Sequence, residues 1–276
     1  SLSNPGKVPA TVNVEIWGAA GPISAPLGQG ILVQPGAQRV LSLAGLAPSE
    51  ASPVIRITST GVGVVAALHA SIVRGLVADG LSVVTGQPAP SVERAIPGVY
   101  LAPEDVIGPI KGKEGYADVA GAIRVLSPLA DASVTVRIVR ASGGETTTQL
   151  DLVAGQVRDL ALVELGSGDV GIIVESSEPV VAAVRQSVGT DQPTDTSWVG
   201  SSYPLLGAAA LAVPAVGESR VTIVNTGEAS VAVNFDGRDV EIPAGGAVTR
   251  PVSTTHQLIA PAPVLIATSG KPSTRS

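Results

Sequence analysis

The chain has 276 residues, of which 45% are hydrophobic and 2% aromatic, and its formal net charge is −6. This length is enough for about two or three domains. The negative charge argues against nucleic acid as a partner, because phosphate binding needs clustered Lys and Arg. The absence of Cys excludes disulfides, thiolate metal sites and Cys nucleophiles.

The first clear predicted strand is Thr11–Trp17, in which apolar and polar residues alternate. A period of two is typical of a half-buried strand, so every second residue is expected to face a core. The same pattern returns in Ser133–Ile138 and again in Ser230–Asp236. The expected inward residues of the three copies are Val12, Val14, Ile16, Val134, Val136, Ile138, Val231, Val233 and Phe235.

Each copy begins after a turn-forming segment that contains Pro or Gly, the residues that provide the backbone angles of tight turns. Late in each copy, a continuous apolar run predicts a central strand that is buried on both faces, with a partner strand just before it. The turns are Asn4-Pro5-Gly6, Ser127-Pro128 and Asn225-Thr226-Gly227. The apolar runs are Gly63–Ala67, Pro179–Ala183 and Pro263–Ala267, with partner strands at Val54–Ile57, Gly171–Val174 and Gln257–Ala260.

The threefold recurrence predicts an all-β protein made of three tandem immunoglobulin-like antiparallel β-sandwich units. The units are expected at residues 1–88, 119–204 and 205–276, with a connection at 89–118 in which Val99–Leu101 pairs briefly. No window has the period and caps of a helix. The alternative is a propeller-like ring, in which the same strand groups would form radial blades.

Both terminal units are expected to have an incomplete edge. The first unit has only Ser1–Ser3 before its turn, and the third has no counterpart of the late strands Leu81–Val84 and Ser197–Val199. Because an unpaired edge is a template for another strand, we expect residues upstream of Ser1 to complete the first unit. The open edge of the third unit is expected to accept a strand from a partner.

The repeat motifs resemble those of a known family. The segments are LSNPGKVPATVNVEIWGAAG at 2–21, VQPG at 33–36, RITS at 56–59 and VGVVAAL at 62–68. They are similar to repeats of an actinobacterial family of unknown function, anchored in the membrane at its N-terminus with the repeats outside the cell. The resemblance implies an extracellular or cell-surface location, with the anchor on an N-terminal segment that has been removed. It brings no catalytic residues, because none are known for the family, and the matching turn motifs indicate fold and location rather than activity.

Nothing in the sequence indicates nucleophilic or zinc catalysis. His69 and His256 fall in different predicted units, so they are not expected to converge on a zinc ion, and His69 is expected at the edge of the core. The segment Gly200-Ser-Ser-Tyr-Pro204 is the nearest approach to a Gly-x-Ser-x-Gly elbow and is interpreted as a loop. We therefore predict no catalytic residue, no cofactor and no resident metal.

Carboxylates come close together in sequence at four places, which we interpret mainly as solvated turns. A glycosidase would need a carboxylate pair beside aromatic sugar platforms, and this composition has few of them. Calcium could use loop oxygens such as those of Asp191, Thr194 and Asp195, although no alternating Asp-x-Asp-x-Asp loop exists. The four pairs are Asp191/Asp195, Asp236/Asp239, Glu175/Glu178 and Glu104/Asp105.

The aromatic residues allow two interpretations. Trp17 points away from the first core, and Trp198, Tyr203 and Tyr100 lie in or beside the connections. The first reading is that they fill the joints between units. The second is that they contact a partner, because exposed Trp and Tyr contribute strongly to interfaces.

These observations predict a non-enzymatic extracellular scaffold of the cell envelope or a protein-interaction module. The alternative is a carbohydrate- or cell-wall-binding module, which would need Trp17 or Trp198 exposed beside polar groups. A hydrolase ranks third. The expected partner is another envelope protein or a cell-wall polysaccharide, with no nucleic acid and no membrane insertion by this segment, since its longest apolar stretch is far below the ~20 residues of a membrane helix.

Overall fold

The computed structural model describes residues 1–48, 50, 53–74, 77–116, 118–162, 165, 167–188, 195–213 and 218–271. Within them the chain forms four antiparallel β-sheets, and its helical elements include α1 (Leu43–Leu46), α2 (Glu104–Lys111) and the 3₁₀ turn η1 (Pro26–Gly28). The protein is therefore all-β. None of the helices described is long and apolar enough to cross a membrane.

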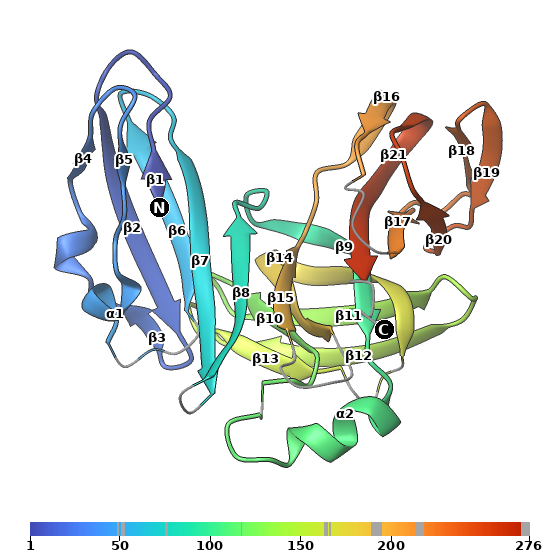
Figure 1. Ribbon diagram of the computed structural model, residues 1–276, viewed down its shortest axis with the longest axis horizontal. Coiled ribbons are helices and arrows are strands. Elements are labelled where there is room, and N and C mark those ends of the chain that lie inside the picture. The colour runs from blue at the N-terminus through green and yellow to red at the C-terminus, as the bar shows by residue number, and fades with distance from the viewer. Residues whose placement is uncertain are drawn as a thin grey trace.

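The N-terminal sheets contain β1 to β8 and lie on the left in Figure 1. One sheet has the order β5-β1-β7-β8, and in the other β2 pairs with β3, β4 and β6. The two sheets share a core in which Leu2 of β1 joins the same cluster as Val12 and Val14 of β2. The strands are β1 Leu2–Ser3, β2 Ala10–Gly18, β3 Gly21–Ile23, β4 Ile31–Val33, β5 Gln38–Arg39, β6 Val54–Thr60, β7 Val65–Arg74 and β8 Val77–Thr85.

The central sheet curls into a half-barrel because its longest strand, β14 (Gly168–Val188), takes part in two ladders. The first half of β14 pairs with β11 and β9, and the second half pairs with β10 and β15. The β11 ladder ends at Ser176 and the β10 ladder begins at Val181, so the strand changes ladder in between. The other strands are β9 Ser91–Leu101, β10 Ala122–Leu126, β11 Ala132–Arg140, β12 Glu145–Leu152, β13 Arg158–Ala161 and β15 Asp195–Gly200.

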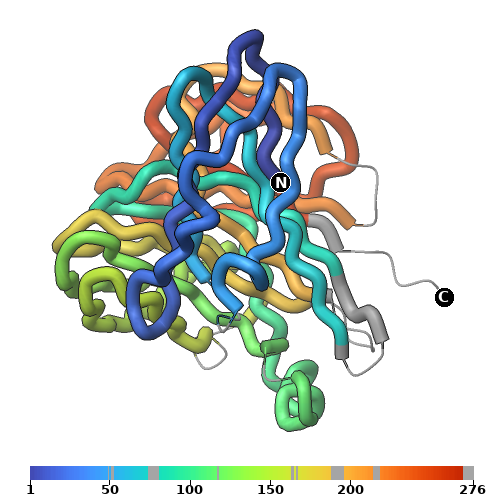
Figure 2. The backbone as a smooth tube through the Cα atoms, turned by 90° about the vertical axis from the view of Figure 1, so that its left-hand side faces the viewer, coloured from blue at the N-terminus to red at the C-terminus, as the bar shows by residue number. Residues whose placement is uncertain are grey.

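The C-terminal sheet is a second half-barrel, at the upper right of Figure 1. Its long strand β21 (His256–Lys271) pairs first with β16 and β18 and then with β17. Pro261 and Pro263 lie where it changes ladder, which fits their lack of a backbone N–H. The other strands are β16 Leu205–Leu211, β17 Glu218–Val224, β18 Val231–Phe235, β19 Arg238–Ile242 and β20 Ala247–Val252. Figure 2 shows this half-barrel behind the N-terminal sheets and α2 projecting below them.

Most of the predicted inward residues are buried. In β2 and β11 the three alternating aliphatics are each 3% exposed or less, and Val233 of β18 is fully buried. Val231 and Phe235, at the ends of β18, are only partly buried but pack against the same cluster. The period-two pattern thus predicted the core face of all three strands.

The predicted partner strands are wrong in the second and third copies. Gly171–Val174 and Pro179–Ala183 are two halves of the single strand β14, and Gln257–Ala260 and Pro263–Ala267 are two halves of β21. In the first copy the two runs are separate strands, β6 and β7, in different sheets. The apolar run in β7 is not buried on both faces either, since the Val65 side chain is 62% exposed there.

Two features of the expected connection at 89–118 differ from the prediction. The pairing of β9 with β14 runs irregularly from Ser91 to Leu101, well beyond Val99–Leu101, and the centre of β9 from Ala95 to Val99 is buried. The segment also contains α2, where Glu104 and Asp105 lie in the first turn and Lys111 in the last, a favourable arrangement for the helix dipole. Eight residues were too few for a helical period to show. The boundaries of the three units remain a prediction.

The turn before each alternating strand depends on a buried polar side chain. Asn225 is 1% exposed; its amide Nδ2 donates to the carbonyls of Ala229 at 2.8 Å and Pro243 at 3.1 Å, and its Oδ1 accepts the N–H of Gly227. Asn4, also 1% exposed, makes the same kind of bonds to Val8, Val33 and Gly6. In the second copy the smaller Ser127 donates to the carbonyl of Ala130. The sequence reading attributed these turns to Pro and Gly and missed the buried Asn.

The incomplete edges lie partly where they were expected. β1 has two residues, but it is flanked by β5 and β7, so its position is closed on both sides. From Leu265 to Lys271, β21 pairs with β17 alone among the described strands, and the missing last strand of the third unit stays a prediction. A further open edge lies on β6, whose single partner within the described residues is β2.

Candidate interaction surface

A polar cluster held together by several side-chain contacts lies on the outer face of β13, β10, β14 and β15, opposite the core. Ile123 and Val125 of β10 point into the core, so Arg124 between them points to the other face. Its Nε and Nη2 donate to the two carboxylate oxygens of Asp159 at 2.7 and 2.6 Å. Its guanidinium also lies over the indole of Trp198, 5.0 Å from the ring centroid. We call Arg124, Asp159, Arg185 and Trp198 the Arg–Trp cluster.

Arg185 is the second cation of this cluster and pairs with Trp198 across the β14–β15 ladder. Burial lowers the pKa of its guanidinium, and the nearby carboxylates of Asp159 and Asp118 oppose that shift. Arg124 has a side chain only 11% exposed, and its fork is already bound to Asp159. The covered face of Trp198 therefore cannot stack on a sugar, and the cluster mainly orders this sheet.

Trp17 lies at a joint between the N-terminal sheets and the central half-barrel. Its Cδ1 is 3.7 Å from the position that a Cβ on Gly155 would occupy, and Pro22 is closer still. Beside it, the N–H of Val157 donates to the carbonyl of Gly18 at 3.1 Å. A second link joins the same two parts, because the Oε1 of Gln87 accepts the N–H of Ser201. Trp17 thus fills a joint.

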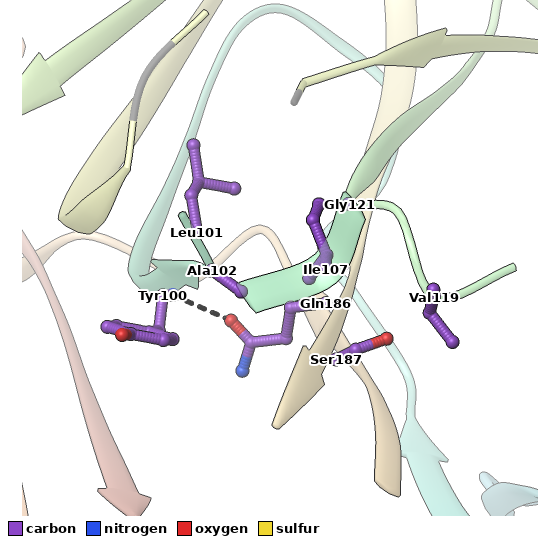
Figure 3. Close-up of a pocket in the computed structure, with 8 residues that line it drawn as sticks. All are labelled: Tyr100, Leu101, Ala102, Ile107, Val119, Gly121, Gln186 and Ser187. Carbon is purple, nitrogen blue, oxygen red and sulfur yellow. Dashed lines mark hydrogen bonds between the residues drawn. The ribbon is translucent and has the colours of Figure 1, made fainter. Parts of the chain in front are cut away.

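Tyr100 lies beside a small cavity in the central half-barrel, which Figure 3 shows between β9, α2 and β14. The backbone N–H of Tyr100 donates to the Oε1 of Gln186 at 2.7 Å. The cavity has a volume of about 10 Å³, which is room for about one water molecule and no organic substrate. Tyr203 is different, since it is 71% exposed, and it lies close enough to Arg94 to oppose the lowering of that residue's pKa by burial. The four predicted aromatics do not form one site.

A second joint, which the sequence reading missed, connects the two half-barrels. The buried residues Ala95, Val139 and Ile173 of the central half-barrel form one cluster with Val224, Ala247 and Leu265 of the C-terminal one. Gly171 lies at its centre, because a Cβ there would be 2.4 Å from a methyl group of Val224. Arg220 also forms an ion pair with Asp169 across the joint. The signal in the sequence was a glycine inside an otherwise β-branched strand.

One protein family matches most of the chain. A family profile, described as a family of unknown function (DUF5719), matches residues 1–260. The chain belongs to this family. No curated protein matches it. Among solved structures, one titled "Crystal Structure of Thermotoga maritima 1070" is 15% identical with a TM-score of 0.34, covers 41% of this chain and 96% of its own, and is too dissimilar to support an argument.

In this DUF5719 chain the two histidines have different surroundings. His69 is exposed on β7, rather than at the edge of the core, and its Nε2 is 3.4 Å from the Oγ of Ser1. The Nδ1 of His256 lies 2.5 Å from the Oδ2 of Asp236, and its ring is 4.9 Å from that of Phe235. Its Nε2 is buried without a partner among the described residues.

In each of the three carboxylate pairs that the structure describes, at least one carboxylate is engaged in a local contact. Asp239 accepts from the amide of Asn234 at 2.8 Å, Glu175 lies 3.5 Å from Arg137, and Glu104 pairs with Lys111. No group of three His, Asp or Glu within the described residues could hold a metal ion. Asp191, Thr194 and the side chain of Asp195 lie outside the described residues.

The Asp236–His256 contact predicts an acid-dependent loss of stability. The hydrogen bond from His256 and the N–H of Gln257 hold the pKa of Asp236 below its ordinary value of 3.8. A depressed pKa in the fold stabilises it above the unfolded value, and this contribution is lost as the pH falls through the folded value. The urea midpoint of Asp236→Asn should therefore fall less than that of the wild type between pH 7 and pH 3. Equal losses would show that this contact contributes nothing.

Proposed function

We propose that this protein is a non-enzymatic scaffold or protein-interaction module of the cell envelope. It would act outside the cell or at the cell surface, where the actinobacterial repeats that it resembles are held by an N-terminal membrane anchor. Its partner would be another envelope protein. The central support is that its parts are joined by specific packing rather than by linkers alone.

The repeated strand register supports three tandem immunoglobulin-like units. Val125 pairs with Ala182 in the second copy, Ile223 with Ile266 in the third, and Leu2 with Ala66 in the first. In both half-barrels the long strand joins two ladders, as in a sandwich whose strands switch sheets. Propeller blades would instead keep each strand within one sheet.

The joint at Gly171 is the observation on which the proposal chiefly rests. A scaffold can hold a bound protein at a defined place only if its neighbouring units keep a fixed arrangement. Contacts between units in tandem arrays are often small and allow the units to move. Here six buried apolar residues from both half-barrels form one cluster, and the absence of a side chain at position 171 permits their close approach. This is the geometry of a fixed joint.

Gly171→Ala tests the joint. The added methyl group must displace Val224, and overpacking of this kind costs about 1–3 kcal/mol. We expect a melting temperature a few degrees lower, together with faster hydrogen exchange at Val224 and Leu265 on the far side of the joint. Gly63→Ala is the control, because a Cβ there meets nothing within 4 Å. If both variants behave like the wild type, the half-barrels are not firmly joined.

A carbohydrate-binding module is the lower-ranked alternative, and a hydrolase ranks below it. Trp17 lies against Gly155 at a joint, Arg124 covers one face of Trp198, and both tryptophans are only partly exposed, which disfavours a sugar platform on either ring. Titration with wall polysaccharide, followed by tryptophan fluorescence, distinguishes the two functions. The scaffold predicts no saturable change, and a saturable change would favour carbohydrate binding.

A further inference from the structure

Arg94 of β9 is a buried cation without a carboxylate partner. The residue is 8% exposed, and its Nε donates to the carbonyl of Val180 at 3.4 Å, which is long for a hydrogen bond. Burial lowers the pKa of Arg94, and the group that opposes this shift is the phenol of Tyr203 rather than an Asp or Glu of the described part of the chain. A buried charge is strongly unfavourable unless it is paired.

Two other arginines of the central half-barrel show the usual arrangement. Arg124, whose side chain is 11% exposed, binds Asp159 at 2.6 Å, and Arg137 binds Glu145 at 2.9 Å. Arg94 has no such carboxylate among the described residues. The pairing that would balance its charge is therefore open to a group of another molecule.

The terminal nitrogens of Arg94 are accessible to such a group. Neither Nη1 nor Nη2 donates a hydrogen bond within the described residues, and neither is enclosed, unlike the Nε of Arg185, which is buried without a partner. Both atoms therefore reach the surface, although most of the residue is covered. A guanidinium presents its nitrogens as a fork that matches the two oxygens of a carboxylate.

The carboxylates of the neighbouring strand positions lie on the other face of the sheet. Arg94 pairs with Val174, which is fully buried, so the two side chains lie on the core side of β9 and β14. Glu93 pairs with Glu175 on the opposite face, where Glu175 is 3.5 Å from Arg137. These two carboxylates are therefore separated from the Arg94 fork by the sheet.

Tyr203 provides an exposed aromatic ring close to Arg94. The residue is 71% exposed, but the backbone before it is fixed. The N–H of Ser202 donates to the carbonyl of Ala95 at 3.3 Å, and the N–H of Ser201 donates to the Oε1 of Gln87 at 3.1 Å. An exposed ring on an ordered backbone loses little conformational freedom on binding, and Tyr is enriched among the residues that dominate interfaces.

We propose that Arg94 and Tyr203 form a binding site for a carboxylate group of a partner protein. The guanidinium fork binds the two carboxylate oxygens, and the ring of Tyr203 packs against apolar atoms of the same segment. The carboxylate belongs either to an Asp or Glu side chain or to the C-terminus of the partner. This inference rests on the proposed interaction function and specifies the chemistry of the partner.

Three peptides added to the full chain test the site, with the NMR signal of the Arg94 Nε–H as the readout. Acetyl-Leu-Glu-Leu-amide has a side-chain carboxylate, acetyl-Leu-Gln-Leu with a free C-terminus has a terminal carboxylate, and acetyl-Leu-Gln-Leu-amide has none. At least one of the two carboxylate peptides should shift the signal saturably, and the peptide without a carboxylate should not. The peptide that binds more tightly identifies the source of the carboxylate.

Arg94→Met should weaken binding about tenfold or more, because it removes charge-assisted hydrogen bonds. Its melting temperature should equal or exceed that of the wild type, because an apolar side chain replaces an unpaired buried cation. Tyr203→Ala should weaken binding without changing the melting temperature, because the ring is exposed. Arg238→Met, which removes an exposed arginine of β19, is the control and should bind like the wild type.

The proposal is overturned if neither carboxylate peptide shifts the Arg94 signal, if the peptide without a carboxylate binds equally well, or if Arg94→Met binds like the wild type. A melting temperature of Arg94→Met several degrees below that of the wild type would also contradict it, because Arg94 would then stabilise the bend at Val180 rather than serve as a binding residue. Failure of this experiment leaves the Gly171→Ala test intact, so the two proposals are separable.

Discussion

Val136→Asp should abolish the cooperative folding of the central half-barrel. Val136 is fully buried in β11, between β12 and β14, and its side chain belongs to a cluster made only of aliphatic residues. A carboxylate there would be unpaired and desolvated, which costs several kcal/mol, a large fraction of the stability of a domain. Circular dichroism and thermal unfolding should show the loss.

Gln149→Asp is the matched control for this substitution. Gln149 lies on the adjacent strand β12 with its side chain exposed, so the same charge there remains in water. Its melting temperature should stay within a degree or two of the wild type, since surface substitutions usually change stability by less than about 0.5 kcal/mol. If Val136→Asp melts like Gln149→Asp, the inward assignment of β11 is wrong.

Asn225→Ala should destabilise the C-terminal half-barrel by about 2–4 kcal/mol. The buried amide makes bonds to three carbonyls and one N–H, and its removal leaves these backbone groups without partners away from water. The turn between β17 and β18 then loses the side chain that fixes it. Chemical denaturation should show a lower midpoint with an unchanged slope.

Asn234→Ala separates burial from the mere loss of hydrogen bonds. Asn234 also binds through both ends of its amide, to Asp239 at 2.8 Å and to the N–H of Gly237 at 3.0 Å, but it does so at the surface. Water can replace these bonds, so the cost should be less than about 1 kcal/mol. Equal costs for the two variants would contradict a special role for the buried turn asparagine.

The sequence predicted the core faces of the strands in which apolar and polar residues alternate. The alternation in β2, β11 and β18 identified the core faces, because one face of each strand is buried and the other is not. It did not show that β14 and β21 each continue through a bend into a second ladder. A Pro in an apolar run can equally mark a loop between two strands, and only the pairing of both halves resolves the choice.

The joints could not be predicted because their signals are weak in a single sequence. In the sequence, Gly171 indicates only a position of low strand propensity. Its role in the joint is recognised only from the structure, in which Val224 packs directly against it. The role of Arg124 over Trp198 depends on β10 and β15 flanking the same half of β14.

The distance between spin labels on opposite parts of the chain tests the fixed arrangement most directly. The chain has no Cys, so Gln34→Cys in the N-terminal part and Glu241→Cys on β19, both exposed positions, can be labelled without background. Double electron–electron resonance should give one narrow distance distribution, since both joints lie between the two labels. A broad or multimodal distribution would show that the parts move independently and would contradict the scaffold.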